Sequence, residues 1–138
     1  MVSELQVTDL DRSLAFWVDL LGFEIAYRRH DEKFVYLERP DGAQVMLEQR
    51  KGRFETAPMA LPFGRGVMMQ VYVDDLEPIR AALAAAGWPL YLAPREIWRR
   101  TGEREGGQRE MFVQDPDGYL LMIAQMIGER AVGSETPA

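Results

Sequence analysis

The stretch Gln108–Gln125, which reads QREMFVQDPDGYLLMIAQ, contains two apolar runs separated by Asp115-Pro116-Asp117-Gly118. Pro116 fixes φ, and Gly118 can adopt the positive φ that a tight reversal needs. Residues 108–114 and 119–125 are therefore predicted to form the antiparallel strands of one hairpin. A smaller copy of the pattern, residues 39–42, reads RPDG and lies between predicted strands at 34–38 and 43–48. This echo suggests a duplicated unit with a cleft between the copies.

The rest of the first half fits one such unit. A strand is predicted at 2–7, and Thr8 or Asp9 can cap the helix that follows it. That helix is predicted to end at Gly22, and strands at 23–29, 34–38 and 43–48 complete the unit. The helix has one apolar face because its apolar residues recur at helical spacing: Leu10, Leu14, Trp17 and Leu21.

The second half restarts the same order of elements. A strand is predicted at 67–73, then a helix capped by Asp74 or Asp75 and ended by Gly87. A short strand at 89–92, a long polar loop at 93–107 and the hairpin at 108–125 follow. The loop makes the second copy longer than the first. The apolar face of the second helix consists of Leu76, Ile79, Leu83 and Ala86.

These observations predict an α+β fold of two tandem βαβββ modules, which form a curved mixed sheet around a cleft with the helices on the outer face. The predicted boundaries are 1–50 for the first module, 51–66 for a linker rich in Gly and Pro, and 67–127 for the second module. Residues 128–138 are predicted to be a flexible tail. A chain of 138 residues is expected to form one compact domain.

The net charge, the cysteine content and the lengths of the apolar runs limit the classes of function that fit the sequence. A formal charge of −6 argues against nucleic-acid binding, which needs a basic face, and suits a cationic small molecule. The same charge can simply keep the protein soluble. The sequence has no cysteine, which excludes disulfides and thiolate metal sites. No apolar run approaches the roughly 20 residues that span a bilayer, so we expect a cytoplasmic protein with no membrane contact.

The sequence resembles the glyoxalase, bleomycin-resistance and extradiol-dioxygenase superfamily, the vicinal oxygen chelate proteins. Three segments carry the resemblance: residues 7–17 (VTDLDRSLAFW), 21–23 (LGF) and 115–119 (DPDGY). Within the superfamily the sequence looks most like the bleomycin-resistance proteins, through Phe16-Trp17 and through Arg109-Glu110 before the final turn. The resemblance implies the two-module fold and a homodimer. In relatives each cleft combines the first unit of one chain with the second unit of the other, often with the first strand exchanged.

Enzymes of this superfamily hold a divalent metal with His and Glu from the first and fourth strands of each unit. The positions that the resemblance assigns here are Val2, Met46, Met68 and Met122, with Glu48 as an alternative to Met46. Valine has no donor atom and a thioether is a soft, neutral ligand. The only histidine, His30, lies in a turn and cannot complete a His/Glu site. We therefore expect no metal and no cofactor.

The three methionines can fill the core or form a soft apolar floor on the open sheet face, and the resemblance favours the floor. Strand parity adds Gln70 to that face. The carboxylates of Glu4 and Glu48 either line the cleft with negative charge or lie on a solvated face. Trp98 and Phe63 are each either stacking platforms for a ligand or loop anchors. The predicted ligand-binding residues are Glu4, Met46, Glu48, Phe63, Met68, Gln70, Trp98 and Met122.

The sequence thus predicts a metal-free binding protein that sequesters a bulky, cationic antibiotic of the bleomycin type, or a related natural product, as a homodimer. The alternative is a metal-dependent glyoxalase- or dioxygenase-like enzyme of the same superfamily. A sensor or interaction module without an antibiotic role is a third hypothesis.

Overall fold

The computed structural model describes residues 1–133, so the last five residues of the predicted flexible tail lie outside the described part of the chain. The first module contains β1 (Ser3–Val7), α1 (Leu10–Leu14), the π-helical turn η1 (Ala15–Leu20), β2 (Glu24–Arg29), the short 3₁₀ turn η2 (His30–Glu32), β3 (Phe34–Glu38) and β4 (Gln44–Gln49). The second contains β5 (Met68–Tyr72), α2 (Glu77–Ala85), β6 (Leu92–Thr101), β7 (Arg104–Gln114) and β8 (Leu120–Ala131).

The strands form two four-stranded mixed sheets with the same topology. Their orders are β1-β4-β3-β2 and β5-β8-β7-β6. In each sheet the first strand pairs in parallel with the last, and the remaining pairs are antiparallel. The predicted α+β fold of two βαβββ modules is therefore confirmed, with the sheet divided into two halves.

The first helix has the predicted apolar face but a different geometry. Asp9 caps it by accepting a hydrogen bond from the Arg12 backbone N–H at 3.2 Å. After Leu14 the helix widens, and the N–H of Leu21 bonds to the carbonyl of Phe16, five residues earlier, at 3.1 Å. The wider turn buries Phe16 beside Trp17, each 1% exposed.

The Asp115–Tyr119 turn joins the two modules. The indole Nε1 of Trp17 donates to Asp115 at 3.2 Å, and the Tyr119 hydroxyl donates to the Gln6 carbonyl at 2.8 Å. Asp117 accepts the backbone N–H of Thr8 at 3.0 Å. One cluster of buried apolar residues drawn from both modules forms the core. The turn that carries the repeat pattern is thus also the joint between the repeats.

The segment 93–107 is not the loop that the sequence predicts. Strand β6 occupies Leu92–Thr101, and β7 begins at Arg104 after a two-residue turn at Gly102 and Glu103. The predicted strand at 89–92 is absent from the described chain except for Leu92, and β8 continues to Ala131, into the segment 128–138 that the sequence predicts to be a flexible tail. The sequence of β6 shows no alternation of apolar and polar residues, because charged side chains lie on both of its faces.

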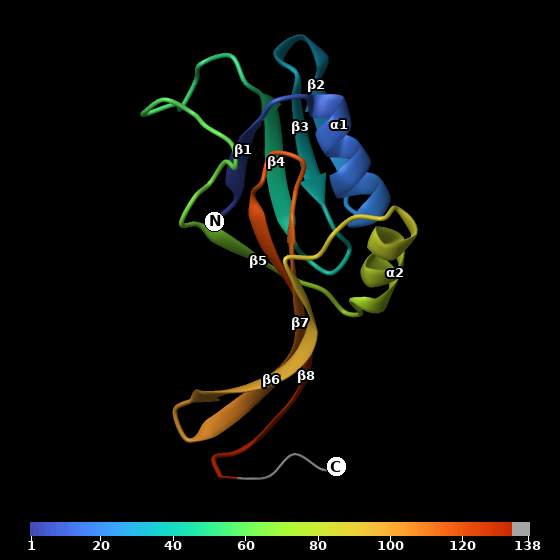
Figure 1. Cartoon of the computed structure of the whole chain (residues 1–138), viewed down its shortest axis with the longest axis vertical. Coiled ribbons are helices and arrows are strands. Elements are labelled where there is room, and N and C mark those ends of the chain that lie inside the picture. The colour runs from blue at the N-terminus through green and yellow to red at the C-terminus, as the bar shows by residue number, and fades with distance from the viewer. Residues whose placement is uncertain (134–138) are drawn as a thin grey trace.

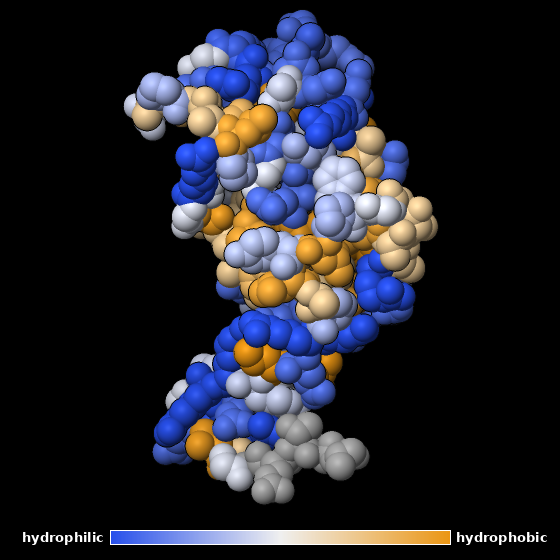
Figure 2. All heavy atoms as spheres, in the orientation of Figure 1, coloured by the Kyte–Doolittle hydropathy of each residue, from blue (hydrophilic) through white to orange (hydrophobic). Residues whose placement is uncertain are grey.

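The outer ends of these three long strands form an arm, defined as residues 95–109 of β6 and β7 with their turn and residues 125–131 of β8, that projects from the body (Figure 1). Helices α1 and α2 lie together on one side of the sheets (Figure 1). Figure 2 shows apolar side chains gathered on the body, whereas the arm is mostly hydrophilic with a few apolar side chains. The helices cover one face of the sheets and leave the other face open.

Candidate functional site

The strongest candidate site is a pocket of about 430 Å³ on the open face of the second sheet, called here the sheet pocket. Side chains alternate across a strand, so Val71, Leu121 and Ile123 face the core while their neighbours face the pocket. The apolar residues that line it come from β5, β7 and β8 and are Met68, Phe112, Met122 and Met126. Phe112 and Met122 lie directly opposite each other in the β7–β8 ladder.

Polar side chains surround this apolar floor. They are Gln70, Tyr72, Arg99, Thr101 and Gln108, and Gly106 completes the lining. The Tyr72 hydroxyl donates to Gln70 Oε1 at 2.8 Å. Met122 is buried, whereas Met68 and Tyr72 are 38% and 46% exposed. The pocket is therefore open to a ligand or to a second protein surface.

A buried carboxylate lies beside the pocket on the same face of β7. Glu110 has no solvent-exposed surface, and Arg99 Nη1 and Nη2 reach its two oxygens at 2.9 and 2.8 Å. Arg95 Nη2 lies 3.2 Å from Oε1. The hydrogen bonds from Arg99 hold the pKa of Glu110 below its usual value, and those from Arg95 act in the same direction. Glu110 is therefore an ionised, fully paired group.

The first module has a corresponding buried carboxylate. Glu48 is 1% exposed, and Arg53 and Lys51 approach its Oε2 at 3.3 and 3.8 Å. Gln6 Nε2 lies 3.4 Å from its other oxygen. Basic side chains thus neutralise Glu48, the buried member of the predicted negative lining, as they neutralise Glu110 in the second module. Glu4, on the same face, is partly exposed.

The register of the parallel strand pairs identifies which residue of β4 corresponds to Met122. Met122 lies opposite Gln70 of β5, and Met46 lies opposite Glu4 of β1. Gln70 stands two positions after Met68, and Glu4 stands two positions after Val2. Met68 and Val2 are the residues at the predicted metal-ligand positions of the two parallel partner segments. Met46, not Glu48, is therefore the counterpart of Met122.

The four positions that the family resemblance assigns to metal ligands thus hold Val2, Met46, Met68 and Met122. One side chain has no donor atom and three offer a soft thioether, so this set does not fit a hard or borderline divalent cation. Across residues 1–133, no group of three or more His, Cys, Asp or Glu side chains is placed to hold a metal ion.

The structure brings together only part of the predicted ligand-binding set. Met68, Gln70 and Met122 line the sheet pocket. Glu4, Met46 and Glu48 lie on the open face of the other sheet, and within residues 1–133 this pocket is lined by second-module residues. In a single chain the two halves of the predicted site are separate.

The two predicted aromatic platforms lie away from the sheet pocket. Phe63 is 4% exposed and packs against Tyr119, with ring centroids 6.0 Å apart, so it is a core residue. Trp98 lies opposite Gly107 on the face of β6 that alternates with Arg99. There the guanidinium carbon of Arg130 lies 4.2 Å from its ring centroid. Phe63 therefore packs within the core, and Trp98 packs against Arg130 on the face of β6 that does not line the sheet pocket.

The predicted ligand-binding set does not include seven of the residues that line the pocket: Tyr72, Arg99, Thr101, Gly106, Gln108, Phe112 and Met126. Two of these residues could have been placed on the pocket face from the sequence alone. Tyr72 shares parity with Met68, and counting outward from the 115–118 turn pairs Phe112 with Met122. Arg99 had none, because its segment was predicted to be a loop.

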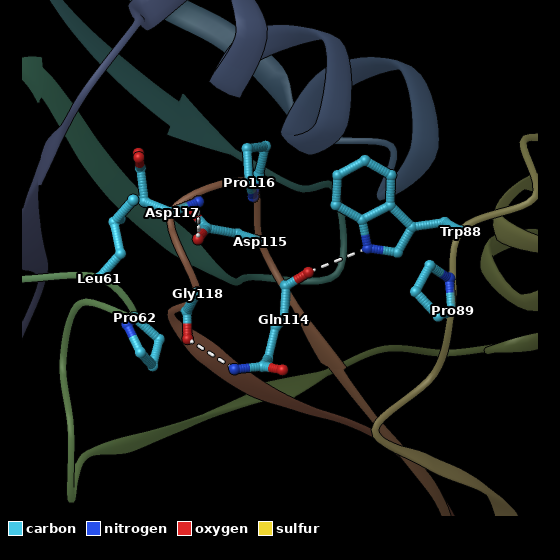
Figure 3. A pocket seen from close by; sticks show the side chains of 9 residues that line it. All are labelled: Leu61, Pro62, Trp88, Pro89, Gln114, Asp115, Pro116, Asp117 and Gly118. Atoms are coloured by element: carbon cyan, nitrogen blue, oxygen red, sulfur yellow. Dashed lines mark hydrogen bonds between the residues drawn. The ribbon is translucent and has the colours of Figure 1, made fainter.

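A second depression, the turn groove, lies at the module joint and has a volume of about 450 Å³. Trp88 Nε1 donates to the Gln114 carbonyl at 3.0 Å, and Gln114 Nε2 donates to the Gly118 carbonyl at 3.2 Å (Figure 3). The Asp115 carboxylate accepts the backbone N–H groups of Asp117 and Tyr119. These polar groups hold the joint together, so the sheet pocket is the better candidate site.

Two βαβββ modules that share one core and leave their sheet faces open define a paired-module α+β protein, with a pocket on one of those faces. The profile of the Glyoxalase/Bleomycin resistance protein/Dioxygenase superfamily matches residues 2–123. The chain belongs to this superfamily. No helix within residues 1–133 combines the length and apolar character needed to cross a membrane.

Similar proteins carry several names. A probable lactoylglutathione lyase of Vibrio parahaemolyticus is 27% identical over 129 residues, covering 88% of this chain and 86% of its own. The crystal structure of TioX from Micromonospora sp. ML1 has a TM-score of 0.66 at 25% identity and covers 92% and 98% of the two chains. A glyoxalase/dioxygenase from Nostoc punctiforme matches with a TM-score of 0.67 at 18% identity, covering 92% and 90%, which supports the fold alone. The identity of the chain is therefore established at the superfamily level, not at the bleomycin-resistance branch.

Proposed function

We propose that this protein is a metal-free small-molecule binding protein of the bleomycin-resistance type, which sequesters a bulky, flat molecule in the sheet pocket. The observation that carries the proposal is the floor of that pocket, where Met68 and Met122 stand at positions that a metalloenzyme would fill with ligands. Methionine adapts its shape to irregular apolar surfaces. Phe112, opposite Met122, offers a ring on which a flat group can stack.

The buried carboxylates give little support to a cationic ligand. The net charge of −6 and the carboxylates of Glu4 and Glu48 led us to expect one. Glu48, and likewise the buried Glu110 of the second module, each already face two basic side chains. A carboxylate paired in this way offers little attraction to a further cation. The proposed binding therefore rests on shape and apolar contact.

A homodimer is part of the proposal. The sheet pocket is open, and Met126 at its edge is 54% exposed. The arm, which projects from the body (Figure 1), supplies Arg99, Gln108 and Met126 to the pocket lining. A second copy could place its first-module face, with Glu4 and Met46, over the pocket. This arrangement would reunite the two halves of the predicted site.

The alternative is a metal-dependent enzyme of the same superfamily. The names of the relatives favour it, because the Vibrio parahaemolyticus and Haemophilus influenzae proteins are named as lactoylglutathione lyases. The residues at the ligand positions count against it. Metal analysis of protein purified without chelator separates the two: stoichiometric Zn, Ni, Mn or Fe would support the enzyme and contradict the proposal.

The binding proposal is tested with the neutral fluorophore phenylnaphthylamine, whose emission rises in an apolar site. We expect saturable binding, with displacement by metal-free bleomycin, mitomycin or a related compound. Phe112→Ala removes the stacking surface, and losing the burial of one large side chain weakens binding about tenfold or more. Phe54→Ala is the control, because Phe54 is 61% exposed in the linker and outside the pocket. Equal effects of both substitutions would contradict the proposed site.

A further inference from the structure

The side chains beside the sheet pocket carry an unbalanced charge. Glu110 supplies one negative charge, and Arg95 and Arg99 both bind it. The cluster therefore keeps one net positive charge on the open face of the sheet. Within the described residues, Arg99 is the only ionisable side chain among the pocket-lining residues that is charged at neutral pH.

Glu110 orients the two arginines but does not occupy all of their hydrogen-bond donors. Arg99 and Glu110 form a two-pronged contact, which holds the guanidinium plane in one direction. A guanidinium has five N–H donors, and Glu110 takes two from Arg99. The Arg99 side chain is 45% exposed and that of Arg95 is 51% exposed. Donors and positive charge therefore remain available at the edge of the pocket.

We propose that the sheet pocket takes an amphiphilic small molecule whose anionic oxygen group, a carboxylate or sulfonate, binds Arg99 and Arg95 while its flat apolar part lies on Phe112 and Met122. This inference rests on the proposed function for the existence of a ligand in the pocket. It replaces the expected cationic ligand with an anionic one, and it assigns Glu110 as the residue that positions the two guanidinium groups.

The test compares two fluorophores with similar rings. Anilinonaphthalene sulfonate carries an anionic group, and phenylnaphthylamine is neutral. Arg99→Gln removes the anchor and should weaken sulfonate binding about tenfold relative to binding of the neutral probe, as expected for the loss of a charge-assisted contact. Arg100→Gln is the matched control, because Arg100 follows in the chain, is exposed and donates to the Gly102 carbonyl instead.

A second variant should change the affinity for the sulfonate probe in the opposite direction. Glu110→Gln keeps the size and the acceptor oxygen of the side chain but removes the negative charge that competes for the arginines. Sulfonate binding should tighten several-fold relative to binding of the neutral probe. A variant that only loosens the fold exposes apolar surface and binds both probes more, so a gain for the sulfonate alone decides the matter if Arg99→Gln proves unstable.

The outcomes separate the inference from the proposed function. If both probes bind wild-type protein but neither Arg99→Gln nor Glu110→Gln changes their ratio, the anion site is wrong and the apolar pocket survives. If the neutral probe fails to bind, or binds Phe112→Ala as tightly as wild type, the proposed function fails and the inference fails with it.

Discussion

At the scale of single residues, the carboxyl group of Asp115 has the least ordinary environment. It is 3% exposed at the joint between the modules, where it accepts hydrogen bonds from Trp17 and from two backbone N–H groups. Burial raises its pKa to about 6, because desolvation outweighs those hydrogen bonds, and the charge of neighbouring Asp117 adds to the increase.

The sign of the effect on stability follows from proton linkage. The folded pKa is above the unfolded value of 3.8, so the native state holds the proton more tightly between about pH 4 and pH 6. The stabilisation is fully present below pH 4 and is lost as the pH rises through 6. At about 1.4 kcal/mol per pKa unit, a shift of about two units is worth up to ~3 kcal/mol.

We therefore predict that Asp115→Asn, which cannot titrate, lacks this decline. Unfolding free energies of both proteins are measured in urea from pH 4.5 to 7.5, and the stability of wild type relative to the variant should fall as the pH rises. The variant must be compared with wild type at each pH, because Glu110 and Asp41 have lowered pKa values and therefore make the stability fall, not rise, as the pH becomes acidic. Parallel pH profiles would contradict the assignment.

At the scale of elements, the arm depends on an aromatic residue packed over glycines. Trp98 lies opposite Gly107 in the β6–β7 ladder, and Gly107 lies opposite Gly128 in the next ladder. A Cβ on Gly107 would lie 2.7–2.8 Å from three atoms of the indole ring. The indole thus covers strand positions that have no side chain of their own, which stabilises an otherwise exposed hairpin.

Gly107→Ala should therefore destabilise the protein by about 1–3 kcal/mol, the usual cost of overpacking a fixed contact. Gly106→Ala is the control on the same strand, because a Cβ there meets no atom within 4 Å. Chemical unfolding of both variants measures the difference. If the two substitutions have equal effects, the Trp98 anchor does not stabilise the arm.

The elements also show what sequence can and cannot predict. Strong patterns were confirmed: the turn at 115–118 and the glycines that end the helices stand as predicted. The predicted apolar helix faces pack into the core except for Ala86, which is exposed at the end of α2. The arm was missed because Arg95, Ile97 and Arg99 face one side and Glu96, Trp98 and Arg100 the other, which gives no apolar alternation. The π-helical turn left no signal, since Phe16 fits a regular helix equally well.

The site was only partly predictable for a related reason. Parity placed Met68, Gln70 and Met122 on one face, and they do line one pocket. Pairing between side chains far apart in sequence, such as Arg99 with Glu110, depends on the strand register of the arm and could not be deduced once the arm was taken as a loop.

At the scale of the whole molecule, the two halves of the predicted site lie on different sheets of one chain. The proposed dimer brings them together, so the protein should elute as a particle of twice the chain mass in size-exclusion chromatography with light scattering. Met126→Asp places a charge on the exposed edge of the pocket and should shift the particle toward monomer. Leu61→Asp, 61% exposed in the turn groove, is the control. A wild-type monomer at all accessible concentrations would contradict the dimer.

The central claim is that the sheet pocket binds a flat apolar molecule without a metal. The most direct measurement is a titration of chelator-treated protein with phenylnaphthylamine, repeated after addition of Ni²⁺ or Zn²⁺. The account predicts saturable binding, one probe per sheet pocket, with the same Kd in both conditions. Binding that appears only after the metal is restored would contradict it, because Met46, Met68 and Met122 would then belong to a metal-dependent site.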